Sequence, residues 1–103
     1  MTASSRPIMV LLDVLGRRWT LRLLWELRAC PLTFRGLRER CDGVSPSVLA
    51  DRLAELRELS LVELGKEGYR LTHQGASLGE LLLPLDAWAK RWARSRATGG
   101  AAQ

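Results

Sequence analysis

The apolar residues at the start of the chain repeat with the period of an amphipathic helix. One set follows the spacing i, i+3, i+4, i+7 and is closed by Gly16: Ile8, Leu11, Leu12 and Leu15. A second set repeats this spacing before Pro31, which ends a helix: Thr20, Leu23, Leu24 and Leu27. The sequence therefore predicts a helix over about residues 7–15 and a second helix beginning near Thr20, with Trp19 at its entrance.

Two further helices are predicted in the middle of the chain, separated by a break at residues 42–43. Thr33 is a good N-cap for the first of them. Its inner face carries Phe34, Leu37 and Cys41. Ser45 and Pro46 begin the second helix, as an N-cap and as a proline at the first helical position, where its missing N–H costs nothing. The inner stripe of this helix, which runs to about Leu59, contains Leu49, Leu53 and Leu56.

Beyond residue 60 the period of the apolar positions changes to two. Val62 and Leu64, and then Tyr69 and Leu71, alternate with polar or small neighbours on either side of residues 66–68. Because this turn segment ends in glycine, the pattern predicts a short β-hairpin.

A last helix is predicted after Thr72, which is suited to cap it. Its apolar stripe continues for about four turns through Leu78, Leu81, Leu82, Leu85, Trp88, Ala89 and Trp92. Pro84 lies inside this stripe and is expected to kink the helix. Residues 1–6 are expected to form a flexible N-terminal arm, residues 7–94 the folded domain, and residues 95–103, rich in Gly and Ala, a disordered tail.

The order of these elements is four helices, a hairpin and a final helix. With a tight turn between the third and fourth helices, this order is typical of a winged helix-turn-helix, a mainly α fold with a small β-hairpin. A chain of 103 residues suits one such domain with one hydrophobic core.

The charge of the chain favours a polyanionic partner such as duplex DNA. There are 16 Lys and Arg residues against 11 Asp and Glu, and most of the cations are arginines, which grip phosphate oxygens and can read guanine edges. A basic protein whose arginine content reflects codon bias would have the same composition. No apolar run approaches the ~20 residues that span a bilayer, and the polar start resembles no signal peptide, so we expect a cytoplasmic protein without membrane partners.

Four stretches of the sequence resemble HxlR-type winged-helix transcriptional regulators. They are LDVLGRRWTLRLLWEL (12–27), TFRGLRERCDGVSPSVLADRLAELRELSLVE (33–63), YRLT (69–72) and LLPLDAWA (82–89). The resemblance implies a homodimer held by the first and last helices, with the fourth helix in the major groove and the hairpin wing touching the backbone or minor groove. The sequence departs from the family in its short wing loop, about residues 65–68, and in Pro7 and Ile8, where many members carry an oxidant-sensing cysteine. Thiol sensing through that position is therefore excluded.

The candidate DNA-binding residues fall into two groups. A helix in the major groove reads bases with its first two turns, which here carry Ser45, Ser47, Val48, Asp51 and Arg52. Arg52 is the best candidate for a base or phosphate contact, unless it pairs with Glu55 or Asp51, and Ser45 is more suited to capping than to reading. The cations expected near the DNA backbone are Arg35, Arg38, Lys66 and Arg70, each of which could instead be a plain surface charge.

Tryptophan and cysteine raise further hypotheses. The chain has four tryptophans, Trp19, Trp25, Trp88 and Trp92. They are expected either to pack in the core and the dimer contact or to line a groove that stacks a flat apolar effector. We expect Cys30 and Cys41 to be reduced thiols, either buried as small hydrophobes or acting in regulation. The lone histidine, His73, is expected at the surface, and nothing in the sequence has the spacing of a metal site, a bound cofactor or an enzyme's catalytic group.

Three functions are consistent with this pattern. The first is a dimeric, sequence-specific DNA-binding regulator, and the second adds control by a small apolar effector. The third is a winged-helix module that has lost DNA binding and binds a protein or ligand instead. The combined weight of element order, basic charge and resemblance favours DNA binding.

Overall fold

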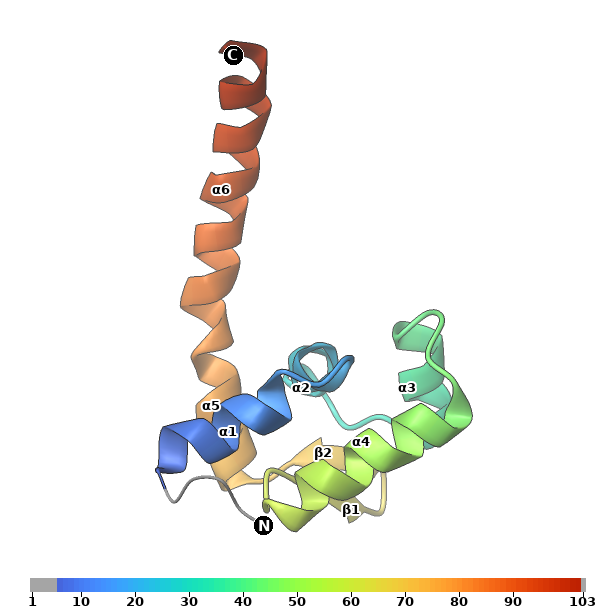
Figure 1. The fold of residues 1–103 in the computed structure, drawn as a ribbon. Helices are drawn as coiled ribbons and strands as arrows, with labels where there is room; N and C mark the ends of the chain where they lie inside the picture. The colour runs from blue at the N-terminus through green and yellow to red at the C-terminus, as the bar shows by residue number, and fades with distance from the viewer. Residues whose placement is uncertain (1–5, 103) are drawn as a thin grey trace.

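A computed structural model describes residues 6–102 of the chain, with side chains as far as residue 98. Within these residues the elements follow the predicted order: α1 (Pro7–Leu15), α2 (Thr20–Leu27), α3 (Phe34–Arg40), α4 (Pro46–Glu58), β1 (Val62–Gly65), β2 (Gly68–Leu71), α5 (His73–Glu80) and α6 (Leu82–Ala102). Figure 1 shows α2, α3, α4 and the hairpin gathered into one body, from which α6 projects as a long single helix. The predicted winged helix-turn-helix is confirmed.

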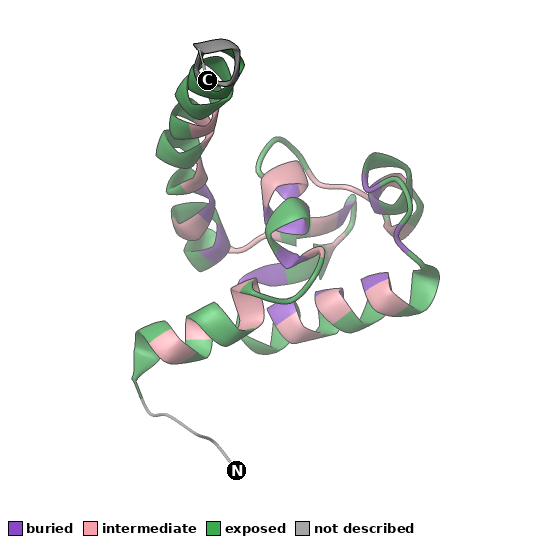
Figure 2. Ribbon diagram, turned by 45° about the horizontal axis from the view of Figure 1, so that its top comes forward, coloured by how far each residue is buried: buried purple, intermediate pink, exposed green. Residues whose placement is uncertain are grey.

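The hydrophobic core is built from the inner stripes of the helices in this body. Each of the predicted stripes of α2 and α4 is buried: Thr20, Leu23, Leu24 and Leu27 on α2, and Leu49, Leu53 and Leu56 on α4. Leu37 of α3 and Val62 of β1 complete the centre of the core. Figure 2 shows these buried faces turned toward one another, whereas α1 and α6 are coloured mostly as exposed or intermediate.

Three predicted N-caps have the expected geometry. The Thr33 hydroxyl accepts from the Gly36 N–H at 3.0 Å, and the Ser45 hydroxyl accepts from the Val48 N–H at 3.2 Å. The Thr72 hydroxyl caps α5 in the same way. Because each cap satisfies a backbone donor that the helix leaves unpaired, these residues fix where α3, α4 and α5 begin.

The hairpin is the predicted wing, with a further backbone contact that the sequence did not indicate. Its two strands are antiparallel, with Gly65 opposite Gly68 at the turn. Leu32, ahead of α3, exchanges two backbone hydrogen bonds with Tyr69, of 2.9 and 2.8 Å. A side chain on Gly68 would collide with the carbonyl of Leu32, and Gly68 has φ of 123°. Glycine is therefore required there both by close approach and by backbone conformation.

Two expectations about the end of the chain are wrong. The last helix is divided at Leu81 into α5 and α6, so Pro84 lies in the first turn of α6, where a proline breaks no hydrogen bond, and does not kink a continuous helix. The predicted disordered tail is helical as far as Ala102. Ala and Arg are strong helix formers, and the Arg96 guanidinium lies 5.1 Å from the centre of the Trp92 ring one turn earlier.

The expected N-terminal arm, residues 1–6, lies outside the described residues except for Arg6. Arg6 has extended backbone angles and stands at the N-cap position of α1. In the described part of the chain no helix is both long enough and apolar enough to cross a membrane.

Candidate nucleic-acid interface

The exposed face of α4 lies opposite its buried leucine stripe. Its first turns carry Ser47, Ala50 and Asp51 at the surface, followed by Ala54 one turn later. Val48 is half-buried and packs against the core, which makes it a poor base contact. Ser45 serves as the cap of α4, and its hydroxyl lies 3.4 Å from that of Ser47. The residues of α4 that are exposed and could contact bases are therefore Ser47, Ala50, Asp51 and Ala54, which are small or acidic.

Arg52, the best sequence candidate for a DNA contact, points elsewhere. Its Nε atom donates a hydrogen bond of 2.9 Å to the carbonyl oxygen of Arg18, in the turn between α1 and α2. Its Nη1 atom lies 3.6 Å from Glu55, and only 19% of the side chain is exposed. The alternative that Arg52 pairs with Glu55 is thus confirmed, and a contact with DNA would require Arg52 to leave Glu55 and the Arg18 carbonyl. The reason is that position 52 on α4 faces the α1–α2 turn rather than the open side of the helix.

A second arginine, Arg17, completes this contact. Arg17 lies 2.7 Å from Glu55 through Nε and Oε2. Glu55 is therefore held between Arg17 and Arg52, one from the turn and one from α4 itself. Acidic residues on a helix surface are too common for the sequence to have revealed the pair.

The two candidate cations of α3 are both exposed. Arg35 lies 3.7 Å from Glu39, one turn along the same helix, in a contact open to solvent. Such a pair contributes little, so Arg35 can exchange Glu39 for a phosphate at small cost. Arg38 has no ion pair among the described residues. Both remain suitable for contact with a DNA backbone.

The wing carries less free positive charge than its sequence suggests. Arg70 lies directly across the hairpin from Glu63, and its Nε atom donates a hydrogen bond of 2.8 Å to Oε2 of that residue. Lys66, at the turn, has no ion pair in the described part of the chain. Of the two predicted wing contacts, Lys66 is therefore free to meet a phosphate, whereas Arg70 would first have to leave Glu63.

A network of charged side chains fastens α2 to α3 behind the interface. Glu26 accepts from Arg22 at 2.8 Å and lies 3.3 Å from Arg40. Arg22 also donates to the backbone carbonyl of Arg40, at 2.7 Å. Because Glu26 is largely buried and satisfied by two arginines, this network fixes the first helix of the helix-turn-helix against α2.

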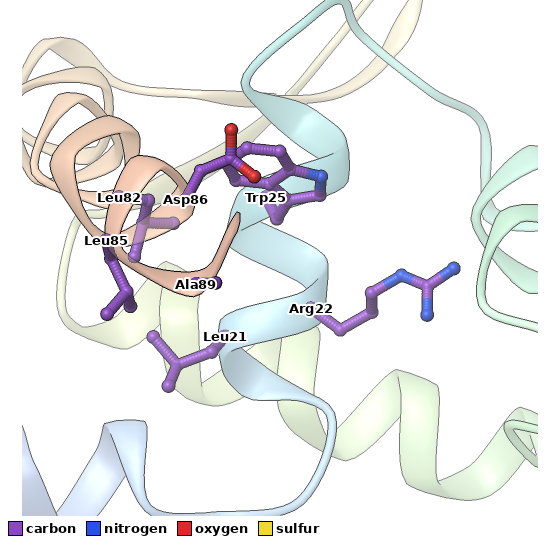
Figure 3. Close-up of a pocket in the computed structure, with 7 residues that line it drawn as sticks. All are labelled: Leu21, Arg22, Trp25, Leu82, Leu85, Asp86 and Ala89. Atoms are coloured by element: carbon purple, nitrogen blue, oxygen red, sulfur yellow. The ribbon is translucent and has the colours of Figure 1, made fainter. Parts of the chain in front are cut away.

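The four tryptophans do not share one groove within the protomer. An apolar pocket of about 250 Å³ lies between α2 and α6 and is lined by Leu21, Arg22, Trp25, Leu82, Leu85, Asp86 and Ala89. Figure 3 shows Trp25 and Leu21 facing α6 across this pocket, with the guanidinium of Arg22 turned away from it. Trp19 packs at the edge of the core.

Trp88 and Trp92 stack on each other along α6, with ring centres 5.9 Å apart. Both are about half exposed. Other large apolar side chains of α1 and α6 are similarly open: Ile8, Val10, Leu12, Leu83 and Leu85. Several exposed large apolar side chains on the same two helices are typical of a protein interface.

The cysteines differ in environment. Cys41 is fully buried at the end of α3, where burial raises the pKa of its thiol; Arg22 lowers that pKa and Glu26 raises it, as smaller effects. Cys30 is exposed, which corrects the expectation that both could be buried hydrophobes. His73 is at the surface, as predicted. Among the side chains of residues 6–98 there is no group of three placed to hold a metal.

A helix-turn-helix followed by a hairpin wing, with the second helix of the pair exposed along its first turns, defines the winged-helix class of transcriptional regulators. The sequence profile of the HxlR-like helix-turn-helix family matches residues 14–97, and the chain belongs to this family. The resemblance stated from the sequence is confirmed.

Known relatives agree with this assignment. The chain is 30% identical over 87 residues to the HTH-type transcriptional regulator YodB of Bacillus subtilis, covering 78% of each protein. It is 28% identical over 87 residues to an HTH-type transcriptional regulator of Methanocaldococcus jannaschii, covering 81% of this chain and 82% of that one. Both relatives are named as HTH-type transcriptional regulators.

Solved structures of similar proteins have the same fold. The quinone-bound YodB of B. subtilis is similar with a TM-score of 0.75 and 30% identity, over 82% of this chain and 96% of that one. A possible HxlR family transcriptional factor from Thermoplasma volcanium is similar with a TM-score of 0.76 and 26% identity, over 86% of each chain.

Proposed function

We propose that this HxlR-family regulator acts in the cytoplasm as a homodimer that binds a specific operator in duplex DNA. The exposed first turns of α4 carry this proposal. The exposed residues of these turns lie on the side of α4 away from its buried leucines, so they can enter a major groove without disturbing the core. Arg38 on α3 and Lys66 at the turn of the wing, neither of which has an ion pair among residues 6–98, support the proposal as phosphate contacts.

Dimerisation through α1 and α6 is supported by the apolar side chains that these helices expose. None of the residues of α1 is fully buried, although most of its side chains are apolar. On α6, Trp88 and Trp92 stack on each other and are about half exposed. Burying such residues stabilises an assembly by roughly 25 cal/mol for each Å² of apolar surface removed from water. A second copy of the chain would present the same surface and cover it symmetrically.

A small apolar effector is a second element of the proposal, and the pocket between α2 and α6 supports it. The similar YodB of B. subtilis has been solved with quinone bound to it. In this chain Leu21, Trp25 and Leu85 would form the apolar walls, and Arg22 and Asp86 are the charged residues that also line the pocket. An effector held there without a covalent bond would alter how α6 packs on α2, and with it the separation of two recognition helices.

The proposed function is tested by fluorescence-anisotropy titration of the full chain. The DNA is the chain's own upstream intergenic sequence, with a scrambled duplex of equal composition as control, at two salt concentrations. We expect tighter binding to the upstream DNA and a steep loss of affinity with salt. Equal or absent binding to both duplexes would contradict the proposal and favour a module that binds a protein partner. Quenching of tryptophan fluorescence by a small quinone, lost in Trp25→Leu, tests the effector separately.

A further inference from the structure

The exposed stripe of α4 is unusual for a basic protein because its charged group is acidic. Ser47, Asp51 and Ala54 follow the spacing i, i+4, i+7 and so share one face, with Ala50 beside them. All four are exposed. Arg52, the cation next to them in the sequence, is bound to the Arg18 carbonyl and leaves this face to the acidic group.

The carboxylate of Asp51 is free to accept hydrogen bonds from outside the protomer. Among the described residues it takes part in no ion pair, although Arg17 and Arg52 both lie nearby in the same shallow depression. Those two arginines are instead engaged by Glu55. Because Glu55 engages both guanidinium groups, neither forms an ion pair with Asp51, and the Asp51 carboxylate stays open to a ligand.

A free carboxylate in a major groove discriminates between bases because it can only accept hydrogen bonds. Cytosine presents its N4 amino group as a donor, whereas guanine presents the acceptors O6 and N7. Adenine also has an amino group, but the adjacent N7 acceptor repels a carboxylate. The methyl groups of alanine side chains, in contrast, make favourable apolar contacts with the C5-methyl group of thymine.

We propose that Asp51 selects a cytosine in each half of the operator, flanked by thymines that contact Ala50 and Ala54. This inference rests on the proposed function, since it requires α4 to lie in a major groove. A carboxylate near phosphates is repelled by them and weakens binding to every DNA sequence. A hydrogen bond from the amino group of a base offsets this repulsion only at sites that place such a group opposite the carboxylate. Asp51 therefore acts through specificity, by rejecting wrong sites, rather than through overall affinity.

The test is selection of binding sites from a randomised duplex library by the full chain and two variants. Asp51→Asn removes the charge and introduces an amide, which pairs bidentately with adenine. Glu58→Gln is the matched control. It removes the same charge from an exposed residue on the same face, about 10 Å farther along the helix, where it cannot reach the same base. Circular dichroism verifies that each variant is folded.

We expect the natural chain and Glu58→Gln to select cytosine at the same position of each half-site, and Asp51→Asn to select adenine there. The discrimination at that position should change by roughly 5- to 150-fold, the effect of one good base contact. If the natural chain selects a defined site and Asp51→Asn selects the same base, the inference is overturned while the proposed function stands. If none of the proteins enriches any duplex, both are overturned.

Discussion

The Nε atom of Arg52 donates a hydrogen bond of 2.9 Å to the carbonyl oxygen of Arg18 and thereby joins α4 to the turn between α1 and α2. Arg17, in the same turn, reaches Glu55 of α4 in the opposite direction. The two contacts hold α4 against the turn that follows α1. Arg52 is therefore a positioning residue.

Replacing Arg52 by Ala should lower the free energy of unfolding by about 1–2 kcal/mol, since a partly buried, charge-assisted hydrogen bond is lost. Affinity for the operator should fall, and the base preference at each operator position should stay the same. Urea unfolding and titration of single-base operator variants measure the two effects. Arg57→Ala, at an exposed position of the same helix, is the control and should leave stability unchanged. A relaxed preference at one base, with stability intact, would show instead that Arg52 reads DNA.

Trp88→Glu should weaken the proposed dimer by about 2–4 kcal/mol, because it places a charge among the exposed apolar residues of α6 that the dimer would bury. Sedimentation velocity over a range of concentrations measures the change. Leu64→Glu is a matched control, because Leu64 on the wing is 52% exposed, as is Trp88. We expect the control to sediment as the natural chain does. If Trp88→Glu sediments as the natural chain does, the dimer interface lies elsewhere.

Lys66→Ala should reduce the slope of log affinity against log salt by about 0.9 for each wing that contacts a phosphate. Arg70→Ala should change that slope less, because Arg70 is already neutralised by Glu63. Lys90→Ala serves as the control, since Lys90 is paired with Asp86 on α6. Anisotropy titrations at several salt concentrations give all three slopes. A larger loss in Arg70→Ala than in Lys66→Ala would contradict this account of the wing.

Cys30 should react quickly with iodoacetamide at neutral pH, and Cys41 should not. Cys41 is buried, and burial holds the pKa of its thiol above the ordinary value. Mass spectrometry of Cys30→Ser, in which Cys41 is the remaining thiol, isolates the slow reaction. Rapid labelling of Cys41 in the folded variant would contradict its burial.

The same shift predicts how stability depends on pH. Because the folded-state pKa of Cys41 lies above the unfolded-state pKa, its contribution to the free energy of unfolding is complete below the unfolded-state pKa. That contribution is lost as the pH rises through the folded-state pKa. Urea unfolding of the natural chain and of Cys41→Ala at neutral and alkaline pH should show a steeper loss in the natural chain.

Local signals in the sequence were sufficient to predict most of the fold. The leucine stripes and the caps Thr33, Ser45 and Thr72 act within one or two helical turns, so the sequence spacing contains the information. The division at Leu81 was not predicted because Pro84 is compatible both with a kink and with a helix start. The bonds between Leu32 and Tyr69 join residues far apart in sequence, and no local pattern indicates them.

The candidate site was less predictable than the fold. Arg52 lies in the second turn of α4 and has the right chemistry for a DNA contact. The sequence does not show that its hydrogen-bond acceptor is the carbonyl of Arg18, because the two residues are far apart in the chain. The exposed apolar residues of α6 have the spacing of a core stripe, because protein interfaces and cores are built from the same residue types. Only the tertiary arrangement separates the two.

The most direct test of dimeric, sequence-specific binding is a hydroxyl-radical footprint of the full chain on its upstream intergenic DNA. A dimer with two recognition helices predicts two protected segments related by approximate two-fold symmetry, with centres about 34 Å apart or a multiple of that spacing. Trp88→Glu should lose both segments together. A single protected segment, or none at concentrations where the chain is dimeric, would contradict the account.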